Sequence, residues 1–456
     1  MKPSFLIGRA RAITCLLIFG LPIIAQAESS VWTNVRSYEP KTPLMRESIT
    51  LEDAIKRTLA DNPNLHEFEF RQQVLAGETK TAGLKPGLIA GVELENFLGT
   101  GEVSGLKELE MTLTLSSVIQ LDNKPAARLG VLSARREQQD VEKKIRTLDL
   151  LGELNRRYIH VLSLQALLAV TKEAEALARY TLEAVSKRVE AGASPLLEQK
   201  RALSALAQSQ LDVDVTKQNL RFAIRSLAIM WGEPNPSFRR VEGKLFVFQE
   251  TASFNALSMA IQNSPHIDLF AQQSRVQSAQ LRLVQAGNRP DIEWSAGIRR
   301  IQGIDETAFV AGVSVPLFQK QRNLGEYEAQ KARLDLIEQQ KQSDVRNLLH
   351  SVNQALGEQQ RALLEVESIQ QNVIPPLKDA LNLVENAYLD GRFSYLEWVS
   401  TRQEFLNTRL ALINAATQVH LSSAEIEALT GISLITQRTA NPSSDGTAGN
   451  AHFDKK

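Results

Sequence analysis

The sequence lacks most of the residue patterns on which enzymes depend. Its 456 residues contain one cysteine, Cys15, so the rest of the chain has no disulfide bond, thiolate metal site or cysteine nucleophile. Six histidines are scattered and form no H-x-x-x-H or H-E-x-x-H pair. The paired carboxylates of Glu365 and Glu367 are typical of a solvated helix surface. We therefore expect no enzymatic activity, no cofactor and no bound metal.

Net charge, aromatics and long apolar runs are also scarce. The formal net charge is +0 and aromatic residues make up 6% of the chain, so nothing indicates a nucleic-acid partner. After the N-terminus no stretch holds 18 continuous apolar residues, which excludes a conventional transmembrane helix there. A membrane role would need strands closed into a barrel, or an amphipathic surface.

The N-terminus has the three parts of a secretory signal. Lys2 and Arg9 provide positive charge, Ile13–Ile24 is a short apolar core, and Ala25–Ala27 matches an A-x-A cleavage site. A single membrane anchor is the alternative, although this apolar run is short for a membrane span. We predict a cleaved signal peptide over residues 1–27 and export of the rest.

The chain contains a long internal repeat. The segments VEAGASPLLE and LDGRFSYLEW carry glycines, Gly192 and Gly391, that lie 199 residues apart. The glycines of Trp231-Gly232 and Thr430-Gly431 show the same spacing. A period of about 200 residues is far longer than a solenoid repeat and indicates a duplicated, domain-sized element.

Each repeat predicts the same order of elements: a short helix, a helix of about 22 residues, two strands, a very long helix, a glycine turn and a returning helix. The predicted segments are an extended arm (28–48), the first repeat (49–232) with its tip near 190–198, a linker (233–253), the second repeat (254–431) with its tip near 388–397, and a disordered tail (435–456).

The strand-like runs alternate between apolar and polar residues. Leu109, Met111 and Leu113 fall on one face, and Glu110 and Thr112 on the other. This alternation suits either a membrane barrel or a soluble sheet packed on helices. Four strands cannot close a barrel alone, so a barrel would have to be shared by several chains. The predicted strands are about 87–98, 109–116, 291–300 and 307–316.

The long helices predict a coiled coil. Residues 123–190 have no interior proline and, as one helix, would extend on the order of 100 Å. A helix of that length needs other helices to pack against along its length. The second long helix, about 321–390, is interrupted by Pro375-Pro376, which predicts a kink or a new segment there.

Three motifs carry a family resemblance. VELENFLGTG (92–101), FVAGVSVPLF (309–318) and GRFSYLE (391–397) occur in order and at suitable spacing. With the repeat, they resemble the outer-membrane efflux channels of the TolC type, and within them the heavy-metal (CzcC-like) branch, over about 51–434. The resemblance implies a mainly α fold with a β-barrel. Three identical chains would share twelve transmembrane strands, continued by a periplasmic α-helical tunnel.

The same resemblance implies a function. The chain would be a passive exit duct in the outer membrane of a Gram-negative cell, with a large periplasmic part. Its partners would be outer-membrane lipid, a periplasmic adaptor and an inner-membrane pump of the resistance–nodulation–division type. The cargo would be heavy-metal cations such as Co²⁺, Zn²⁺ or Cd²⁺. Two alternatives remain: the same duct for drugs or type I protein secretion, and a soluble periplasmic coiled-coil scaffold or adaptor, against which the four strands argue.

The two glycine turns would be the periplasmic tips. In the family such tips contact the adaptor and close the tunnel. Glycine supplies the tight turn, and the following serine and leucine restart the helix. The predicted adaptor contacts are Gly192, Ser194, Leu197, Gly391, Ser394 and Leu396.

The family closes its tips with an acid on one hairpin bonded to a tyrosine and an arginine on the other. Tyr388 matches the tyrosine, and Glu190 is assigned as the acid. Arg392 lies one residue before the usual arginine position, which Phe393 occupies. We predict a gate formed by Glu190, Tyr388, Asp390 and Arg392.

Polar residues of the strands would face the lumen. An acidic lumen would favour cations electrostatically, although simple wetting of the wall accounts for the same residues. The predicted lumen residues are Glu93, Glu95, Glu110, Asp291, Glu293 and Arg299.

Overall fold

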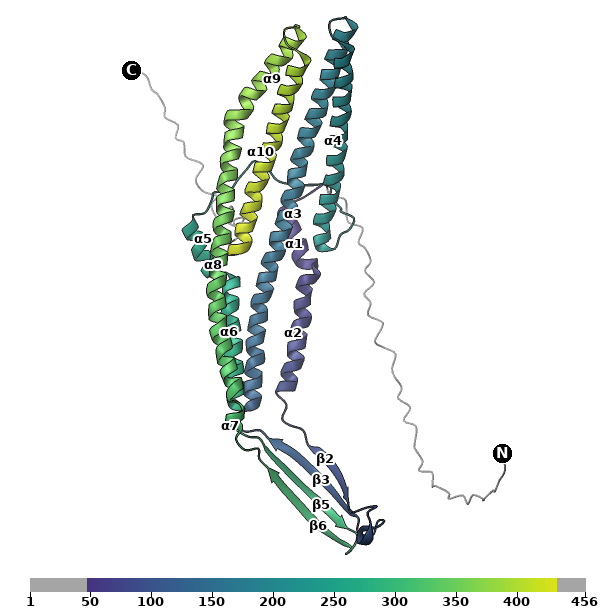
Figure 1. Ribbon diagram of the computed structural model, residues 1–456, viewed down its shortest axis with the longest axis vertical. Helices are drawn as coiled ribbons and strands as arrows, with labels where there is room; N and C mark the ends of the chain where they lie inside the picture. Colours follow the sequence, from purple (N-terminus) through teal and green to yellow (C-terminus); the bar gives the residue numbers. More distant parts are fainter. Residues whose placement is uncertain (1–46, 433–456) are drawn as a thin grey trace, which may run out of the picture. The chain divides into compact units, whose positions relative to one another are not determined.

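The computed structural model describes residues 47–432. The predicted signal peptide with Cys15, almost all of the predicted arm, and the predicted tail lie outside the described residues. Helices form most of the described chain (Figure 1). None of these helices is both long and apolar enough to cross a membrane.

The helices follow the predicted repeat. The first repeat contains α1 (Leu51–Asp61), α2 (Pro63–Ala82), α3 (Lys124–Glu190), α4 (Leu196–Ala228) and a short 3₁₀ turn, η2 (Ile229–Trp231). The second contains α5 (Phe254–Gln262), α6 (Pro265–Ala286), α7 (Gln319–Arg322), α8 (Leu324–Ser368), a π-helical turn η3 (Ile369–Val373), α9 (Ile374–Leu389) and α10 (Tyr395–Thr430).

Local sequence fixes the helix ends. Pro63 and Pro265 are the first residues of α2 and α6, where a missing amide hydrogen costs nothing. Gly232 and Gly431 close the two repeats with φ of +79° and +72°, a left-handed backbone that glycine adopts without strain. The interruption predicted at Pro375-Pro376 is confirmed by η3.

A four-stranded antiparallel sheet joins the two repeats. Its strands are β2 (Ile89–Glu95), β3 (Glu110–Ile119), β5 (Ile292–Ile301) and β6 (Glu306–Ser314), in the order β2-β3-β5-β6 (Figure 1). Within the described chain β2 and β6 are therefore unpaired edges. A second, two-stranded sheet pairs β1 (Ser48–Ile49) with β4 (Arg240–Val241) in parallel.

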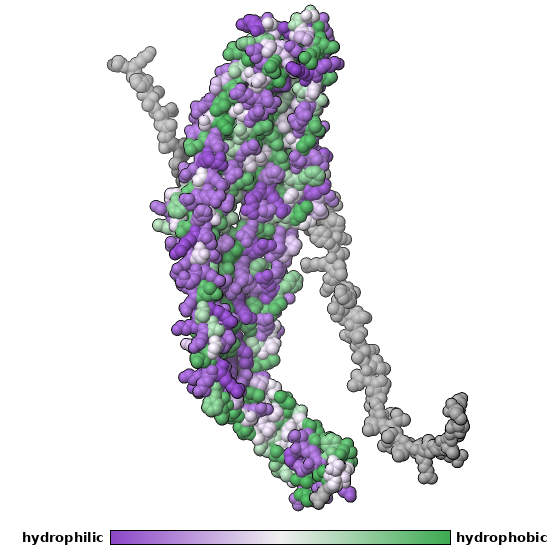
Figure 2. Space-filling view, viewed as in Figure 1, coloured by the Kyte–Doolittle hydropathy of each residue, from purple (hydrophilic) through white to green (hydrophobic). Residues whose placement is uncertain are grey.

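One face of the four-stranded sheet is apolar and uncovered. The register aligns Val92, Leu113, Ile298 and Phe309 in one row across all four strands. All four are exposed, and Phe309 is 94% exposed. Hydrophobic residues are frequent over the strands in Figure 2, whereas hydrophilic residues are frequent along the helices. The mainly helical fold with a small alternating sheet is as predicted.

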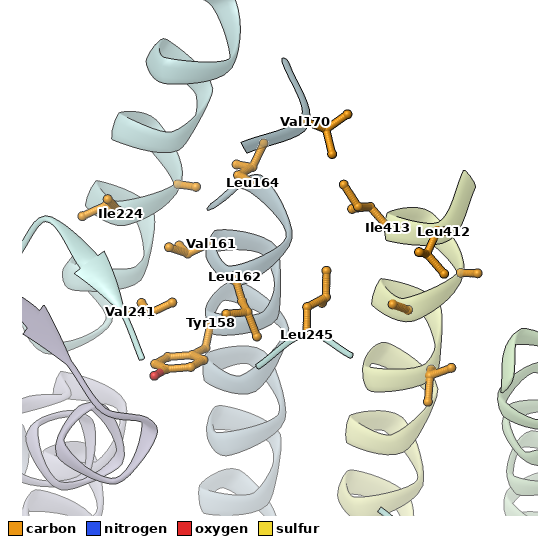
Figure 3. Close-up of a cluster of buried hydrophobic side chains, with 14 of the residues drawn as sticks. Tyr158, Val161, Leu162, Leu164, Val170, Ile224, Val241, Leu245, Leu412 and Ile413 are labelled. Carbon is orange, nitrogen blue, oxygen red and sulfur yellow. The ribbon is translucent and has the colours of Figure 1, made fainter. Parts of the chain in front are cut away.

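Part of the core lies where the linker 233–253 crosses the helices. In Figure 3, Tyr158 of α3 and Leu245 of the linker lie among side chains from α4 and α10. The Tyr158 hydroxyl donates to the Glu242 carbonyl at 2.5 Å. The Gln165 side chain pairs with both the amide and the carbonyl of Val241, at 2.8 and 3.1 Å. These bonds fix the linker and β4 to α3.

Candidate functional site

Each tip is a short turn between two long helices. Gly192 (φ +70°) lies between α3 and α4, and Gly391 (φ +79°) lies between α9 and α10. The amide of Gly192 donates to the Val189 carbonyl at 3.0 Å, and that of Gly391 to the Tyr388 carbonyl at 2.9 Å. The predicted tight turns are therefore present, with glycine where a left-handed backbone is needed.

Only the second tip restarts its helix with serine. Ser394 caps α10: its hydroxyl accepts from the Glu397 amide, and the Glu397 carboxylate accepts from the Ser394 amide at 2.8 Å. These backbone and side-chain bonds from Ser394 lower the pKa of Glu397. In the first tip Pro195 takes the cap position, and Ser194 instead accepts a bond from Arg188 Nε at 3.2 Å. The predicted capping role of Ser194 was wrong.

The tips expose apolar side chains. Leu197 is 59% exposed and Leu396 is 67% exposed. Leu196 and Phe393 are also exposed. Such a group at the end of a helix hairpin is available for contact with another protein.

Tyr388 is buried between the two hairpins. Its hydroxyl donates to Glu198 Oε2, on α4, at 3.1 Å. Its ring lies 5.0 Å from the Trp398 ring, centroid to centroid. Burial raises the pKa of Tyr388, and the nearby Glu198 carboxylate adds to that rise. The hydroxyl therefore stays a donor at neutral pH.

Arg188 of α3 makes the second contact across the tips. Its Nη1 donates to the carbonyls of Tyr388 and Leu389, at 2.9 and 3.0 Å. Its guanidinium lies 4.9 Å from the centroid of the Tyr388 ring. A cation at the C-terminal end of α9 satisfies carbonyls that have no helical partner. We name this cluster of three residues the tip latch: Arg188, Glu198 and Tyr388.

Of the four residues in the predicted gate, only Tyr388 contacts the other hairpin, and its partners there are Glu198 and Arg188. Glu190 is exposed and makes no side-chain hydrogen bond or ion pair within residues 47–432. It follows Arg188 by two positions, which is about 200° around the helix, so it faces away from the second hairpin. Asp390 and Arg392 pair with each other at 2.7 Å inside one tip.

A buried cation lies behind the latch. Arg402 of α10 is 6% exposed and donates to Thr181 Oγ1 of α3 at 2.9 Å. It makes no ion pair among the described residues. Burial lowers the pKa of Arg402 from its usual high value. Nothing in the local sequence indicated that Arg402 is buried, because a single arginine in a long helix is typical of the surface.

The register places the predicted lumen residues on the polar face of the sheet. Glu95 is opposite Glu110, and Glu93 lies in a row with Thr112 and Arg299. Arg299 pairs with Glu95 at 3.0 Å and with Glu110 at 2.8 Å.

Asp291, just before β5, pairs with Lys124 Nζ at 2.6 Å, a partner that sequence reasoning missed. Glu93 and Glu293 are exposed and have no ion pair within the described chain. The unbalanced negative charge is therefore smaller than the number of acids suggests. In residues 47–432, no three His, Cys, Asp or Glu side chains gather closely enough to hold a metal ion.

Known proteins share both the sequence pattern and the fold. The family model described as "Outer membrane efflux protein" matches residues 256–432, which is almost the whole second repeat. The cobalt-zinc-cadmium resistance protein CzcC of Cupriavidus metallidurans is 22% identical over 415 residues, covering 90% of this chain and 96% of that protein. Over its second repeat the chain is therefore similar to the outer membrane efflux protein family.

Solved structures of outer-membrane channels have the same fold. CusC superposes with a TM-score of 0.69 at 15% identity, covering 83% of this chain and 91% of that one. VceC of Vibrio cholerae gives 0.65 at 19% identity, covering 84% and 96%. OprN gives 0.67 at 14% identity, covering 84% and 90%. The chain thus has the fold of these outer-membrane channels.

Proposed function

We propose that this chain is the outer-membrane channel of a tripartite resistance–nodulation–division efflux system, and a passive exit duct for heavy-metal cations of the Co/Zn/Cd type. One observation carries the proposal: the similarity to a cobalt-zinc-cadmium resistance protein extends over 90% of this chain and 96% of that relative. The resemblance therefore covers the whole architecture and not one shared domain.

The open edges of the sheet support an assembly of three copies. Unpaired strand edges expose backbone donors and acceptors that must be satisfied inside a membrane. If β6 of one copy pairs with β2 of the next, three copies close a sheet of twelve strands, and their helices surround one tunnel. In this proposal the chain performs no reaction and needs no cofactor, and an inner-membrane pump supplies the energy.

The tip latch supports a gate at the periplasmic end. Arg188 and Glu198 of the first hairpin hold Tyr388 of the second. We assign the latch to the closed state, in which charge-assisted bonds keep the hairpins together. A periplasmic adaptor that binds the exposed leucines, Leu197 and Leu396, would separate them and open the duct.

The test is a deletion strain exposed to a panel of toxic compounds. Survival and cellular metal content are measured with cobalt, zinc, cadmium, copper, silver and several drugs. Loss of the chain should sensitise the cells to one or two of the metals and raise their content of those metals. Re-expression of the wild-type chain should reverse both effects.

Two other outcomes are informative. Sensitivity to drugs alone would keep the efflux duct and remove the metal cargo. Release of the chain from membranes by salt would contradict the channel and favour a soluble scaffold, because a membrane-embedded sheet requires detergent for release.

A further inference from the structure

The two hairpins differ in the helix that leads to each tip. α3 is one uninterrupted α-helix, whereas its counterpart is divided into α8, η3 and α9. At the repeat spacing of 199 residues, Pro375 and Pro376 correspond to Ala176 and Leu177 of α3. The break is therefore specific to the second hairpin, and the first hairpin provides an internal control for its effect.

The backbone ladder is weakened at η3. The amide of Ile374 donates to the carbonyl of Ile369, five residues earlier instead of four. Pro375 and Pro376 have no amide hydrogen, so two further ladder bonds are missing. No side chain of η3 is buried. Bending at this point therefore breaks fewer backbone hydrogen bonds than bending in an uninterrupted part of the helix.

Polar side chains anchor the helix on both sides of η3, whereas at η3 itself only Ile369 packs against the core. Upstream, Gln359 of α8 bonds to Ser423 of α10 at 2.7 Å. Downstream, the latch holds α9 at Tyr388. Between residues 369 and 383 no side chain of the described structure bonds or ion-pairs with another helix. There α9 is held by apolar packing, to which Leu377 and Leu381 contribute.

We infer that η3 is the hinge on which α9 swings when the tip latch is released. This inference rests on the proposed gate and adds the moving element to it. A hinge is a short segment that absorbs a change of backbone angle while the elements on either side stay rigid. A change of about 20° at η3 moves residue 383, which lies ten residues beyond the end of η3, by about 5 Å.

Two pairs of spin labels distinguish a hinge from a helix that tilts as a whole. One pair, Arg179 with Leu383, lies between η3 and the tips. The other, Arg156 with Gln360, lies on the opposite side of η3. All four positions are exposed. Each pair joins α3 to the α8–α9 line. Labels are placed on cysteines in the full chain, with Cys15 replaced, and the labelled chain is diluted with unlabelled chain in detergent.

The latch is released by Tyr388→Phe combined with Arg188→Ala. Pulsed EPR should then show the 179–383 distance lengthening by about 5 Å, with the 156–360 distance unchanged. If both distances lengthen together, the helix tilts as a whole and the hinge is refuted. The hinge is also refuted if the variant with the released latch conducts more current while its 179–383 distance stays unchanged.

A variant in which the helix is continuous through η3 provides a second test of the hinge. Deleting Gln371 and replacing Pro375 and Pro376 with alanine removes the extra residue of the π turn and restores the helical ladder. In the released background this variant should keep the 179–383 distance short and return the bilayer conductance to the level of the latched chain. A conductance that stays high contradicts the hinge. Absence of any channel conductance in the unmutated chain contradicts the proposed function instead.

Discussion

At the scale of single residues, the tips show that position around a helix, and not distance along the chain, determines which acid contacts Tyr388. Glu190 and Glu198 are both acids close to Gly192, and only Glu198 lies in the first turn of α4, facing Tyr388. Sequence distance to the glycine favoured Glu190, whereas position around the helix selects Glu198. The repeat contained the missing signal, because Glu198 and Glu397 occupy equivalent positions in the two tips.

Replacing Tyr388 with phenylalanine tests the latch. The change removes one hydroxyl and leaves the ring packed against Trp398. The lost bond has a charged acceptor, and such bonds contribute roughly 1.5–3 kcal/mol. We expect the closed-state conductance in planar bilayers to rise severalfold. Arg392→Ala is the matched control, because its ion pair with Asp390 stays within one tip. Unchanged conductance in Tyr388→Phe would remove the gate from the proposal.

Replacing Arg402 with methionine tests whether the unpaired buried charge weakens the closed packing. A buried cation with one neutral acceptor is poorly compensated, and apolar replacements of similar volume stabilise other proteins by about 1–4 kcal/mol. We expect the melting temperature of the detergent-solubilised chain to rise. The control, Arg409→Met, removes an ion pair with Glu173 and should not raise it. A lower melting temperature in Arg402→Met would mean that Arg402 has a compensating partner in the assembly.

At the scale of elements, the sequence specified more of the fold than of the site. Proline and glycine positions located the helix starts, the two tips and the break in the second long helix, because each acts through local backbone geometry. The partners of Arg299, Asp291 and Tyr388 depend on which faces of distant elements meet. The linker shows the same limit: nothing local in residues 233–253 indicates that Gln165 and Tyr158 hold it to α3.

The linker also makes stability depend on pH through His420. Its Nε2 lies 2.9 Å from the Leu245 carbonyl, and its ring packs against Phe248. Burial lowers the pKa of His420, while the Leu245 bond opposes this change. The unfolded chain therefore binds a proton at higher pH than the folded chain. Stability from this group is fully present above the unfolded pKa of 6.5 and is lost as pH falls from there towards the lower folded value.

The prediction compares how the stability of the wild-type chain and of the variant His420→Gln changes with pH. His420→Gln keeps a donor for Leu245 and removes the titration. Between pH 7 and pH 5 the wild-type chain should lose more stability than the variant, at a slope of at most about 1.4 kcal/mol per pH unit. Thermal melts at each pH provide the comparison. If the stability of the two chains falls equally between pH 7 and pH 5, His420 contributes nothing to the pH dependence.

At the scale of the whole molecule, the sheet presents two faces to two different environments. On one face Arg299 lies between Glu95 and Glu110; on the other, Phe309 is almost fully exposed with no covering helix in the described chain. This apolar face lies at the end of α3 opposite to the tips (Figure 1). This separation suits the proposed duct, in which the sheet contacts lipid and the tips contact the adaptor.

Replacing Phe309 with glutamate tests that separation. If the apolar face contacts lipid, a charge placed there is unfavourable, by about 2–4 kcal/mol for a basic side chain at the bilayer midplane and by less for glutamate. An assembly of three copies bears this cost three times. We expect the variant to be lost from the detergent-extracted outer-membrane fraction. Glu293→Gln, on the opposite face of the neighbouring strand, should insert normally because it removes a charge from the polar side. Normal insertion of Phe309→Glu would show that this face is covered by protein, since buried protein contacts and not lipid would then explain its apolar residues.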